Sequence, residues 1–376
     1  MQPKLAFLTT VNHNVGDDFI REGIVYFVKR IIGSFDSVCI HKHEPVRPGP
    51  HIFKLWGLSH IWKNMRREYV SNYFDQILNA DIIIQAGAPV YWLNKYHNSS
   101  LAEWVTPFWY ERISKVYKDI PVLNIAAGSC IADDRSCEDM LKHKKLKKFI
   151  RDIHAFCRIT TVRDVVAHDL LKELNLSSVL LPCTSLFARE SLNIHNDDEK
   201  YFVINYMPLG GHYLYDQKRY INIWKKKVRE VSKLAQKKFM VKWVCHNKNE
   251  YMQAQMMNVD NKDIFYSDDY KDYIAFYGQC VGGLLNRIHG AMMIGSYGRK
   301  SLVVGIDSRL KMADLVGIPN MVLSEIEHLS AREIMDTILS NRDTFKNEIK
   351  KLIQNAKKQY LQIFENYLTS VTNEKK

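Results

Sequence analysis

The sequence has little of what marks membrane-spanning, disulfide-rich or zinc-binding proteins. No apolar run approaches the roughly 20 residues that a membrane-spanning helix requires. The run KLAFLTTV near the start is too short, and too soon followed by charge, for a signal peptide. The 7 cysteines are scattered and include no C-x-x-C pair, which argues against a disulfide framework and a zinc ribbon. We therefore expect a cytoplasmic protein with reduced thiols.

Most short motifs that carry enzyme chemistry are also missing. The chain contains no H-E-x-x-H, no clustered aspartates at metal-ligand spacing, no Walker loop, no complete G-x-G-x-x-G and no nucleophile elbow. It also lacks the mixture of basic and aromatic residues that is typical of nucleic-acid-binding modules. These absences predict a protein without a metal site and without a nucleic-acid partner.

Positive charge is in excess, with 53 Lys and Arg against 41 Asp and Glu and a net charge of +12. The excess favours anionic partners such as lipid headgroups or phosphorylated small molecules. Much of it lies in LKHKKLKKFIR (141–151) and KKKVREVSKLAQKK (225–238), where apolar residues recur at helical spacing. We expect two amphipathic helices whose basic faces contact either solvent or an anionic membrane surface.

The 376 residues are enough for two domains, and short apolar runs alternate with helical patterns along most of the chain. This alternation predicts βαβ units and parallel sheets. The expected strands lie at 4–11, 81–87, 122–128, 158–164, 178–183, 201–207, 239–246, 263–267, 281–286 and 301–307. We therefore predict an α/β fold with two Rossmann-like domains, 1–192 and 200–330, whose parallel sheets face a cleft, followed by a helical segment at 331–376.

Folds of this kind bind ligands at the carboxyl ends of their strands. In TTVNHNVGDDFI a strand runs through a turn into a helix, which makes Asn14, Gly16 and Asp17 ligand-lining candidates, with helix capping as the alternative. Arg163 ends the strand of RITTVRD, where its guanidinium suits a phosphate or carboxylate or pairs with an aspartate. His246 ends the strand of MVKWVCH and is either a binding group or a buried, hydrogen-bonded histidine.

The stretch GLLNRIHGAMMIGSYGRKSLVVGID (283–307) places Arg287 and His289 where a strand turns into a helix. Residues two apart in such a turn project to the same side, so the two side chains are expected to share a pocket. The dipole of the helix N-terminus opposes protonation of His289 unless a bound anion compensates. With such an anion in place, His289 is a candidate general acid. Arg309 follows the next strand as a binding candidate or as part of an ordinary ion pair.

The order of these features resembles the polysaccharide pyruvyl transferase family over about residues 5–320. The matching segments are NHNVGDDFI, IIIQAGAPV (82–90), LNIAAGSCIAD (123–133), TVRDVVAHDLL (161–171), VCHNKNEY (244–251) and NRIHGAMMIGSYGRKSLVVGIDSR (286–309). The last segment is similar to the family's R-[LI]-H-[AG]-x-x motif, followed by an apolar strand and an Asp-containing turn. The resemblance implies a GT-B-like pair of Rossmann domains, with the N-terminal domain on the acceptor side and the C-terminal domain on the donor side.

The resemblance also implies an activity. The donor would be phosphoenolpyruvate, with no other cofactor, and the product would be a pyruvate ketal on a sugar of a surface polysaccharide or its precursor. The family's motif residues fall on Arg163, Arg287 and His289, with Arg163 and Arg287 as the anion clamp, His289 as the proton donor and Asp17 as acceptor-positioning group or base. If the protein contacts the inner face of the membrane, the sugar acceptor would be a lipid-linked oligosaccharide.

The sequence departs from the family pattern after the strand of VLLPCTSLF, where relatives often carry Asp-Pro and this chain has Leu181-Pro182-Cys183. Two other interpretations stay open. One is a GT-B glycosyltransferase that uses a sugar nucleotide, and the other is a non-catalytic glycan-assembly or sugar-binding protein.

Overall fold

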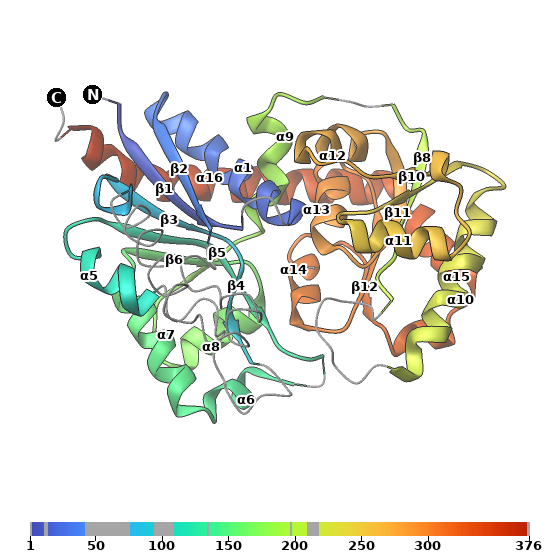
Figure 1. Ribbon diagram of the computed structural model, residues 1–376, viewed down its shortest axis with the longest axis horizontal. Coiled ribbons are helices and arrows are strands. Elements are labelled where there is room, and N and C mark those ends of the chain that lie inside the picture. Colours follow the sequence, from blue (N-terminus) through green and yellow to red (C-terminus); the bar gives the residue numbers. More distant parts are fainter. Residues whose placement is uncertain are drawn as a thin grey trace, which may run out of the picture.

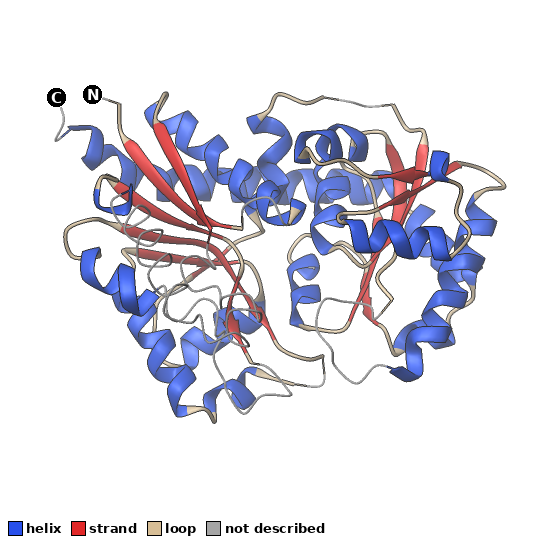
Figure 2. Cartoon of the chain, in the orientation of Figure 1, coloured by secondary structure: helices blue, strands red, loops and turns tan. Residues whose placement is uncertain are grey.

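The computed structural model describes residues 2–10, 14–41, 76–93, 109–133, 135–195, 198–208 and 218–373. Two separate parallel sheets lie side by side, each with helices packed against it (Figures 1 and 2). The predicted α/β fold with two Rossmann-like sheets is therefore confirmed.

The N-terminal sheet has the strand order β2-β1-β3-β5-β6-β7, and β4 pairs with β5. Its strands are β1 Lys4–Thr9, β2 Asp36–His41, β3 Ile82–Ala86, β4 Pro89–Trp92, β5 Val122–Cys130, β6 Ile159–Val162 and β7 Val179–Leu180. All of its pairings are parallel. The central strands read as near-continuous apolar runs because helices cover both faces.

The C-terminal sheet has the order β10-β9-β8-β11-β12-β13 and is parallel throughout. Its strands are β8 Tyr201–Asn205, β9 Met240–Val244, β10 Ile264–Phe265, β11 Cys280–Leu285, β12 Ser301–Gly305 and β13 Asn320–Val322. Counted from β8, this is the 3-2-1-4-5-6 order of a doubly wound dinucleotide-binding fold. Every predicted strand is present, whereas β2, β4 and β13 were not predicted.

The helices that flank the sheets follow the strands in the usual alternation. They are α1 Val15–Ile32, α5 Ser114–Val116, α6 Cys137–Leu141, α7 Lys144–Phe156, α8 Val165–Glu173, α9 Ala188–Ser191, α10 Lys218–Ala235, α11 Lys248–Met256, α12 Tyr270–Tyr277, α13 Ile288–Ser296, α14 Lys311–Asp314, α15 Ala331–Leu339 and α16 Arg342–Asn373. Short turns of other helix types include η2 Thr184–Phe187 and η4 Ser308–Leu310. The two basic segments lie in α6–α7 and α10, as the helical spacing predicted.

The last helix joins the two domains. Near its start, Ile349 of α16 packs against Gly295 of α13 in the C-terminal domain. Near its end, the rings of Tyr360 and Phe364 lie 5.0 and 5.7 Å from the ring of Phe27 on α1. Figure 1 shows α16 running behind both sheets, so that the two ends of the chain lie near each other. The helical segment therefore packs on both domains rather than on one.

Within the described ranges, no helix combines the length and the apolar character needed to cross a bilayer.

Candidate active site

The candidates at the starts of α1 and α13 lie where the strand order of each sheet reverses. In the N-terminal sheet this point is between β1 and β3, and in the C-terminal sheet it is between β8 and β11. Helices α1 and α13 begin just beyond β1 and β11, so their N-termini point into the space between the domains. Such crevices outside the carboxyl ends of the strands are the binding sites of open α/β sheets.

The first turn of α1 carries the N-terminal candidates. The side chain of Asn14 caps the helix by accepting a hydrogen bond from the backbone N–H of Gly16 at 3.1 Å. Asp17 is buried and accepts a hydrogen bond from the hydroxyl of Thr10. A Cβ atom on residue 16 would lie only 2.3 Å from Nδ1 of His289, so the approach of His289 to α1 requires glycine at this position.

Arg163 and His289 meet across the domain boundary. Nη1 of Arg163 and Nε2 of His289 are 3.2 Å apart. A guanidinium only donates hydrogen bonds, so Nε2 of His289 is the acceptor and its proton resides on Nδ1. Arg163 is 2% exposed, and its Nε atom would lie 2.7 Å from a Cβ on residue 128, which is glycine. The arginine is thus enclosed on all but its cleft side.

Among the described residues, no carboxylate oxygen lies at ion-pair distance from Arg163, whose Nη1 atom is 3.2 Å from His289 and 3.8 Å from the Sγ atom of Cys183. The charge of Arg163 acts on its neighbour Asp164 without a hydrogen bond between them. The Asp164 carboxyl instead caps α8 by accepting from the N–H of Ala167 and also accepts from the N–H and hydroxyl of Ser129. A buried guanidinium without a hydrogen-bonded counter-ion is costly, and an anionic ligand would offset that cost. Cys183 is part of the Leu181-Pro182-Cys183 segment that departs from the family pattern.

Burial lowers the pKa of His289 well below its usual value, and the charge of Arg163 lowers this pKa further. Asp17 acts in the opposite direction, while the more distant Arg309 and Arg287 add to the lowering. His289 is therefore a neutral imidazole in the unliganded cleft. A bound dianion would reverse the sign of the local field and favour the imidazolium.

Arg287 lies beside His289 in sequence but contacts different residues. Its side chain donates to Oε1 of Glu250 through Nε at 2.8 Å and through Nη2. Its backbone N–H donates to Oδ1 of Asn205 at 2.9 Å, and Nδ2 of Asn205 in turn donates to Glu250 at 2.9 Å. This buried network at the ends of β8 and β11 fixes Arg287 within the C-terminal domain, whereas His289 reaches the N-terminal domain. Ile288 between them is buried.

His246 lies at the end of β9 and is 6% exposed. Its Nε2 atom is 2.7 Å from the hydroxyl of Tyr277, and its backbone N–H donates to Oε2 of Glu250. Burial lowers its pKa well below the usual value, and the nearby charge of Arg287 lowers it further. It is a neutral, hydrogen-bonded histidine at the rim of the cleft.

Arg309 is held by Asp307 in a bidentate ion pair with distances of 2.7 and 2.6 Å. The turn that carries both residues also contacts the other domain. The N–H of Ser308 donates to the carbonyl of Ile131, and the hydroxyl of Ser308 lies 2.8 Å from that of Ser129. The turn after β12 is thereby joined to the end of β5, directly beside Arg163.

The structure brings His289, Arg163, Gly16 and Asp17 together, with Arg309 within electrostatic reach. Asn14 and His246 lie to one side of this group, and Arg287 lies behind it, in the network with Glu250 and Asn205. Sequence reasoning missed Glu250 and Asn205, the two partners of Arg287. The N-x-x-E spacing of Asn247 and Glu250 is that of a helix cap and could have drawn attention to the carboxylate. Among the described residues, no three His, Cys, Asp or Glu side chains are grouped to hold a metal ion.

Solved structures with the same arrangement of two sheets are distant in sequence. The UDP-GlcNAc 2-epimerase from Methanocaldococcus jannaschii has a TM-score of 0.52 at 9% identity, covering 93% of this chain and 99% of that one. A putative UDP-N-acetylglucosamine 2-epimerase from Listeria monocytogenes has a TM-score of 0.51 at 11% identity, with 93% and 91% covered. The S. aureus MnaA–UDP co-structure has a TM-score of 0.51 at 11% identity, with 96% and 97% covered. These likenesses show a GT-B-like fold.

The comparison with curated proteins gave no significant match. A family model, by contrast, covers most of the chain and includes the residues that meet in the cleft. The model for polysaccharide pyruvyl transferase matches residues 14–308, from the cap of α1 to the turn that contacts β5, and the chain therefore belongs to the polysaccharide pyruvyl transferase family.

Proposed function

We propose that the protein transfers the pyruvyl group of phosphoenolpyruvate to two hydroxyls of a sugar in a polysaccharide or its precursor, forming a pyruvate ketal and releasing phosphate. The observation that carries the proposal is the buried Arg163 guanidinium, which has no ion-pair partner among the described residues and contacts a neutral His289. This pair can take up a small dianion and gain a proton in the same event.

The donor would be bound by charge. Phosphoenolpyruvate carries a carboxylate and a phosphate, each of which suits a guanidinium fork. Arg163 offers such a fork directly, and the free N–H groups at the start of α13 add a partial positive charge, since Arg287 at the N-cap forms no side-chain cap. Arg287 and Arg309, held by Glu250 and Asp307, contribute to the positive field. These groups would supply charge stabilisation in the transition state.

His289 would act as the general acid once the donor is bound. It gives its proton to the methylene carbon of phosphoenolpyruvate, which leaves a cationic centre at the carbon that bears the phosphate oxygen. One sugar hydroxyl adds there and loses its proton, with Asp17 or His289 as the acceptor. The bond from this carbon to the phosphate oxygen then breaks with its electron pair on phosphate, and a second hydroxyl adds and loses its proton to close the ketal.

The acceptor remains the less defined substrate. A lipid-linked oligosaccharide would bring the protein to the inner face of the membrane, where the exposed lysines of α7 and α10 suit an anionic surface. Structures of similar fold have been solved with UDP or UDP-GlcNAc, so a sugar-nucleotide donor is the competing interpretation. A sugar-binding protein without activity is the third.

Thermal shift separates these interpretations. We expect phosphoenolpyruvate to raise the melting temperature, and UDP-GlcNAc to leave it unchanged; the reverse pattern would overturn the proposal.

His289→Ala should keep the stabilisation by phosphoenolpyruvate and lower acceptor-dependent phosphate release by about 10²–10⁴-fold. His168→Ala, at a half-buried histidine on α8, is the matched control and should release phosphate at the wild-type rate. Mass spectrometry of surface glycans from a deletion strain would show the missing pyruvyl group.

A further inference from the structure

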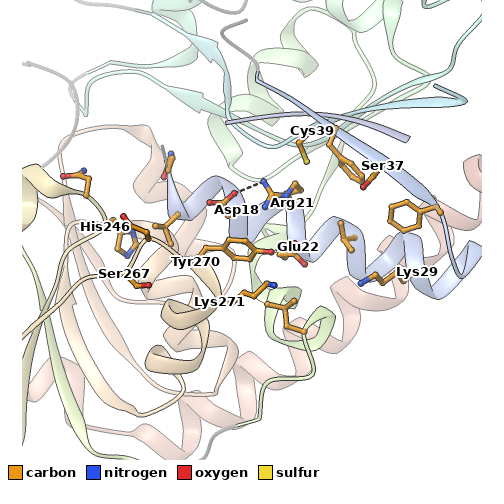
Figure 3. Close-up of a pocket in the computed structure, with 18 of the residues that line it drawn as sticks. Asp18, Arg21, Glu22, Lys29, Ser37, Cys39, His246, Ser267, Tyr270 and Lys271 are labelled. Carbon is orange, nitrogen blue, oxygen red and sulfur yellow. Dashed lines mark hydrogen bonds and ion pairs between the residues drawn. The ribbon is translucent and has the colours of Figure 1, made fainter. Parts of the chain in front are cut away.

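A groove of about 1120 Å³ lies between α1 and the segment from β10 to α12 (Figure 3). The N-terminal domain contributes Asp18, Arg21 and Glu22, and the C-terminal domain contributes Ser267 and Tyr270. Figure 3 shows these side chains facing one another across the space between the domains. Because both domains form its walls, the groove exists only while they are apposed.

The groove begins next to the catalytic residues. Asn14 and His246 both line it. Asn14 caps the helix whose Gly16 packs on His289, and His246 lies close enough to Arg287 and His289 to interact with them electrostatically. A molecule in the groove can therefore extend to the reaction centre. Arg163 and His289 are not among its lining residues, so the proposed donor does not need this space.

The polar groups of the groove are held in place before any ligand arrives. Glu22 accepts hydrogen bonds from the hydroxyl of Tyr270 at 2.8 Å and from that of Ser191 at 3.2 Å. Arg21 is paired with Asp18 at 2.7 Å, and its guanidinium carbon lies 5.5 Å from the centre of the Tyr270 ring. The ring of Tyr270 therefore lies beside the Glu22 carboxylate and the Arg21 guanidinium, and these contacts fix the positions of all three groups.

Asp18 adds a carboxyl group that is only partly ionised near neutral pH. Burial raises its pKa to about 6, although Arg21 opposes the rise. Near neutral pH a fraction of this carboxyl is protonated, so the group can donate as well as accept hydrogen bonds. Hydroxyl groups, which also do both, are natural partners for it.

The groove carries charges of both signs. Asp18 and Glu22 lie on one wall with Arg21 and Lys29, and Asp268 lies on the other with Lys248 and Lys271. Helices α11 and α12 begin at the groove, but the side chains of Asn247 and Asp269 cap them, which weakens both helix ends as sites for phosphate. A ligand rich in hydroxyls fits this mixture of donors and acceptors, since a sugar ring packs its apolar face on an aromatic ring and directs its hydroxyls to polar side chains.

We propose that this groove binds the saccharide chain of the acceptor beyond the sugar that receives the pyruvyl group, with Tyr270 as the stacking platform. The proposal rests on the proposed function, because it places the reacting sugar beside His289. It names an oligosaccharide as the substrate, rather than a single sugar.

The test measures binding to an array of mono- to hexasaccharides of hexose, N-acetylhexosamine and hexuronate units. Wild-type protein should bind oligosaccharides about tenfold or more tightly than the matching monosaccharides, and Tyr270→Ala should remove this difference. Tyr117→Ala, which removes another half-buried tyrosine ring in contact with an aromatic neighbour on the far side of the N-terminal domain, should bind as wild type does. Equal binding by Tyr270→Ala and Tyr117→Ala, or no dependence on chain length, would overturn the proposal.

Two further measurements keep the outcome interpretable. Tyr270→Phe keeps the ring and loses only the hydroxyl with its polar contacts, so it should retain most of the oligosaccharide affinity even if Tyr270→Ala folds poorly. Stabilisation by phosphoenolpyruvate is measured on the same variants. If oligosaccharide binding depends on Tyr270 but phosphoenolpyruvate does not stabilise the protein, phosphoenolpyruvate is not the donor. The same result would support the groove as the binding site of the saccharide chain. Displacement of the oligosaccharide by UDP-GlcNAc would instead assign the groove to a nucleotide.

Discussion

At the scale of single residues, the close approach of His289 to α1 depends on the missing side chain of residue 16. The same is true of Arg163 and residue 128. The sequence predicted Gly16 as a ligand-lining residue, not as a contact of His289, and it placed Gly128 only at the end of a strand. Side-chain identity predicted Arg163, Asp17 and His289 as site residues, but it gave no indication that the arginine of one domain would donate to the histidine of the other.

Gly16→Ala is expected to displace the imidazole of His289 while keeping the helix intact. The displacement should lower turnover about 10–100-fold, since errors near 1 Å in a catalytic group have such effects. The free energy of unfolding should change by less than about 1 kcal/mol, because alanine is the better helix former.

Gly317→Ala is the matched control for this substitution. Residue 317 has φ +67° and open space around its Cβ position, so alanine there should cost about 1–2 kcal/mol of stability without touching the site. Urea denaturation and steady-state kinetics on both variants separate the two effects. Loss of activity in Gly317→Ala, or full activity in Gly16→Ala, would contradict the assigned role of Gly16.

The low pKa of His289 also predicts a pH dependence of stability. Below about pH 6.5 the unfolded chain takes up a proton on this histidine that the folded protein does not bind, so the folded state loses stability as the pH falls. His289→Gln lacks this proton. As the pH falls, the free energy of unfolding of the variant should therefore rise relative to that of the wild type. The rise should be up to about 1.4 kcal/mol per pH unit between about pH 6.5 and the lower pKa of His289 in the folded protein. Urea denaturation at about pH 7.5 and about pH 5.5 measures the difference, and a constant difference would show that His289 titrates as a free imidazole.

At the scale of elements, strands were predictable wherever they are buried on both faces. Strands β3, β5, β8, β11 and β12 consist mainly of apolar or small residues, and both ends of each lie within two residues of the predicted ends. Strand β2 begins with the exposed Asp36 and Ser37, β4 begins with a proline, and β13 has three residues. These edge strands carry too few buried residues to give a pattern of their own.

The helical period of residues 331–373 was visible, but its packing partners were not. Periodicity identifies an apolar stripe without naming what covers it. In the structure the stripe of α16 changes partner along its length, from α13 to α1 and η2. The same limit applies to Glu250, whose partner Arg287 lies in a distant part of the sequence.

Tyr360→Ala should destabilise the protein by about 3–5 kcal/mol, the usual cost of removing a fully buried aromatic ring. The ring packs between Phe27 and Phe187, and its hydroxyl donates to the carbonyl of Pro182. Leu352→Ala, at a side chain on the same helix that is 38% exposed, should change the free energy of unfolding by less than about 0.5 kcal/mol. Equal effects in chemical denaturation would mean that α16 does not anchor the N-terminal domain.

At the scale of the whole molecule, the site exists because two domains are held against each other. Arg163 and Asp17 come from one domain, His289 and Arg309 from the other. The contacts from Ser308 to Ser129 and Ile131 fix this arrangement within a few residues of the site. The sequence predicted two domains facing a cleft, yet Ser129 and Ser308, which help to join them beside the site, have a role that depends on the tertiary contact alone.

Ser308→Ala removes the two hydrogen bonds of the hydroxyl and should destabilise the apposed arrangement by about 1–3 kcal/mol. If the apposed state is the one that binds substrate, the KM for the proposed donor, phosphoenolpyruvate, should rise by up to about tenfold. Ser296→Ala removes a buried hydroxyl whose bond stays within α13 and should leave KM unchanged. A KM that responds equally to both substitutions would show a general loss of stability instead.

The return of α16 to the first domain has a consequence for how the protein is made. Phe27 and Phe187 emerge from the ribosome long before Tyr360 and Phe364, which cover them. At about 5–20 residues per second, the interval between residues 187 and 360 is roughly 9–35 s. During that time an apolar face of the nascent N-terminal domain stays uncovered, which makes it a natural substrate for chaperones that act during translation.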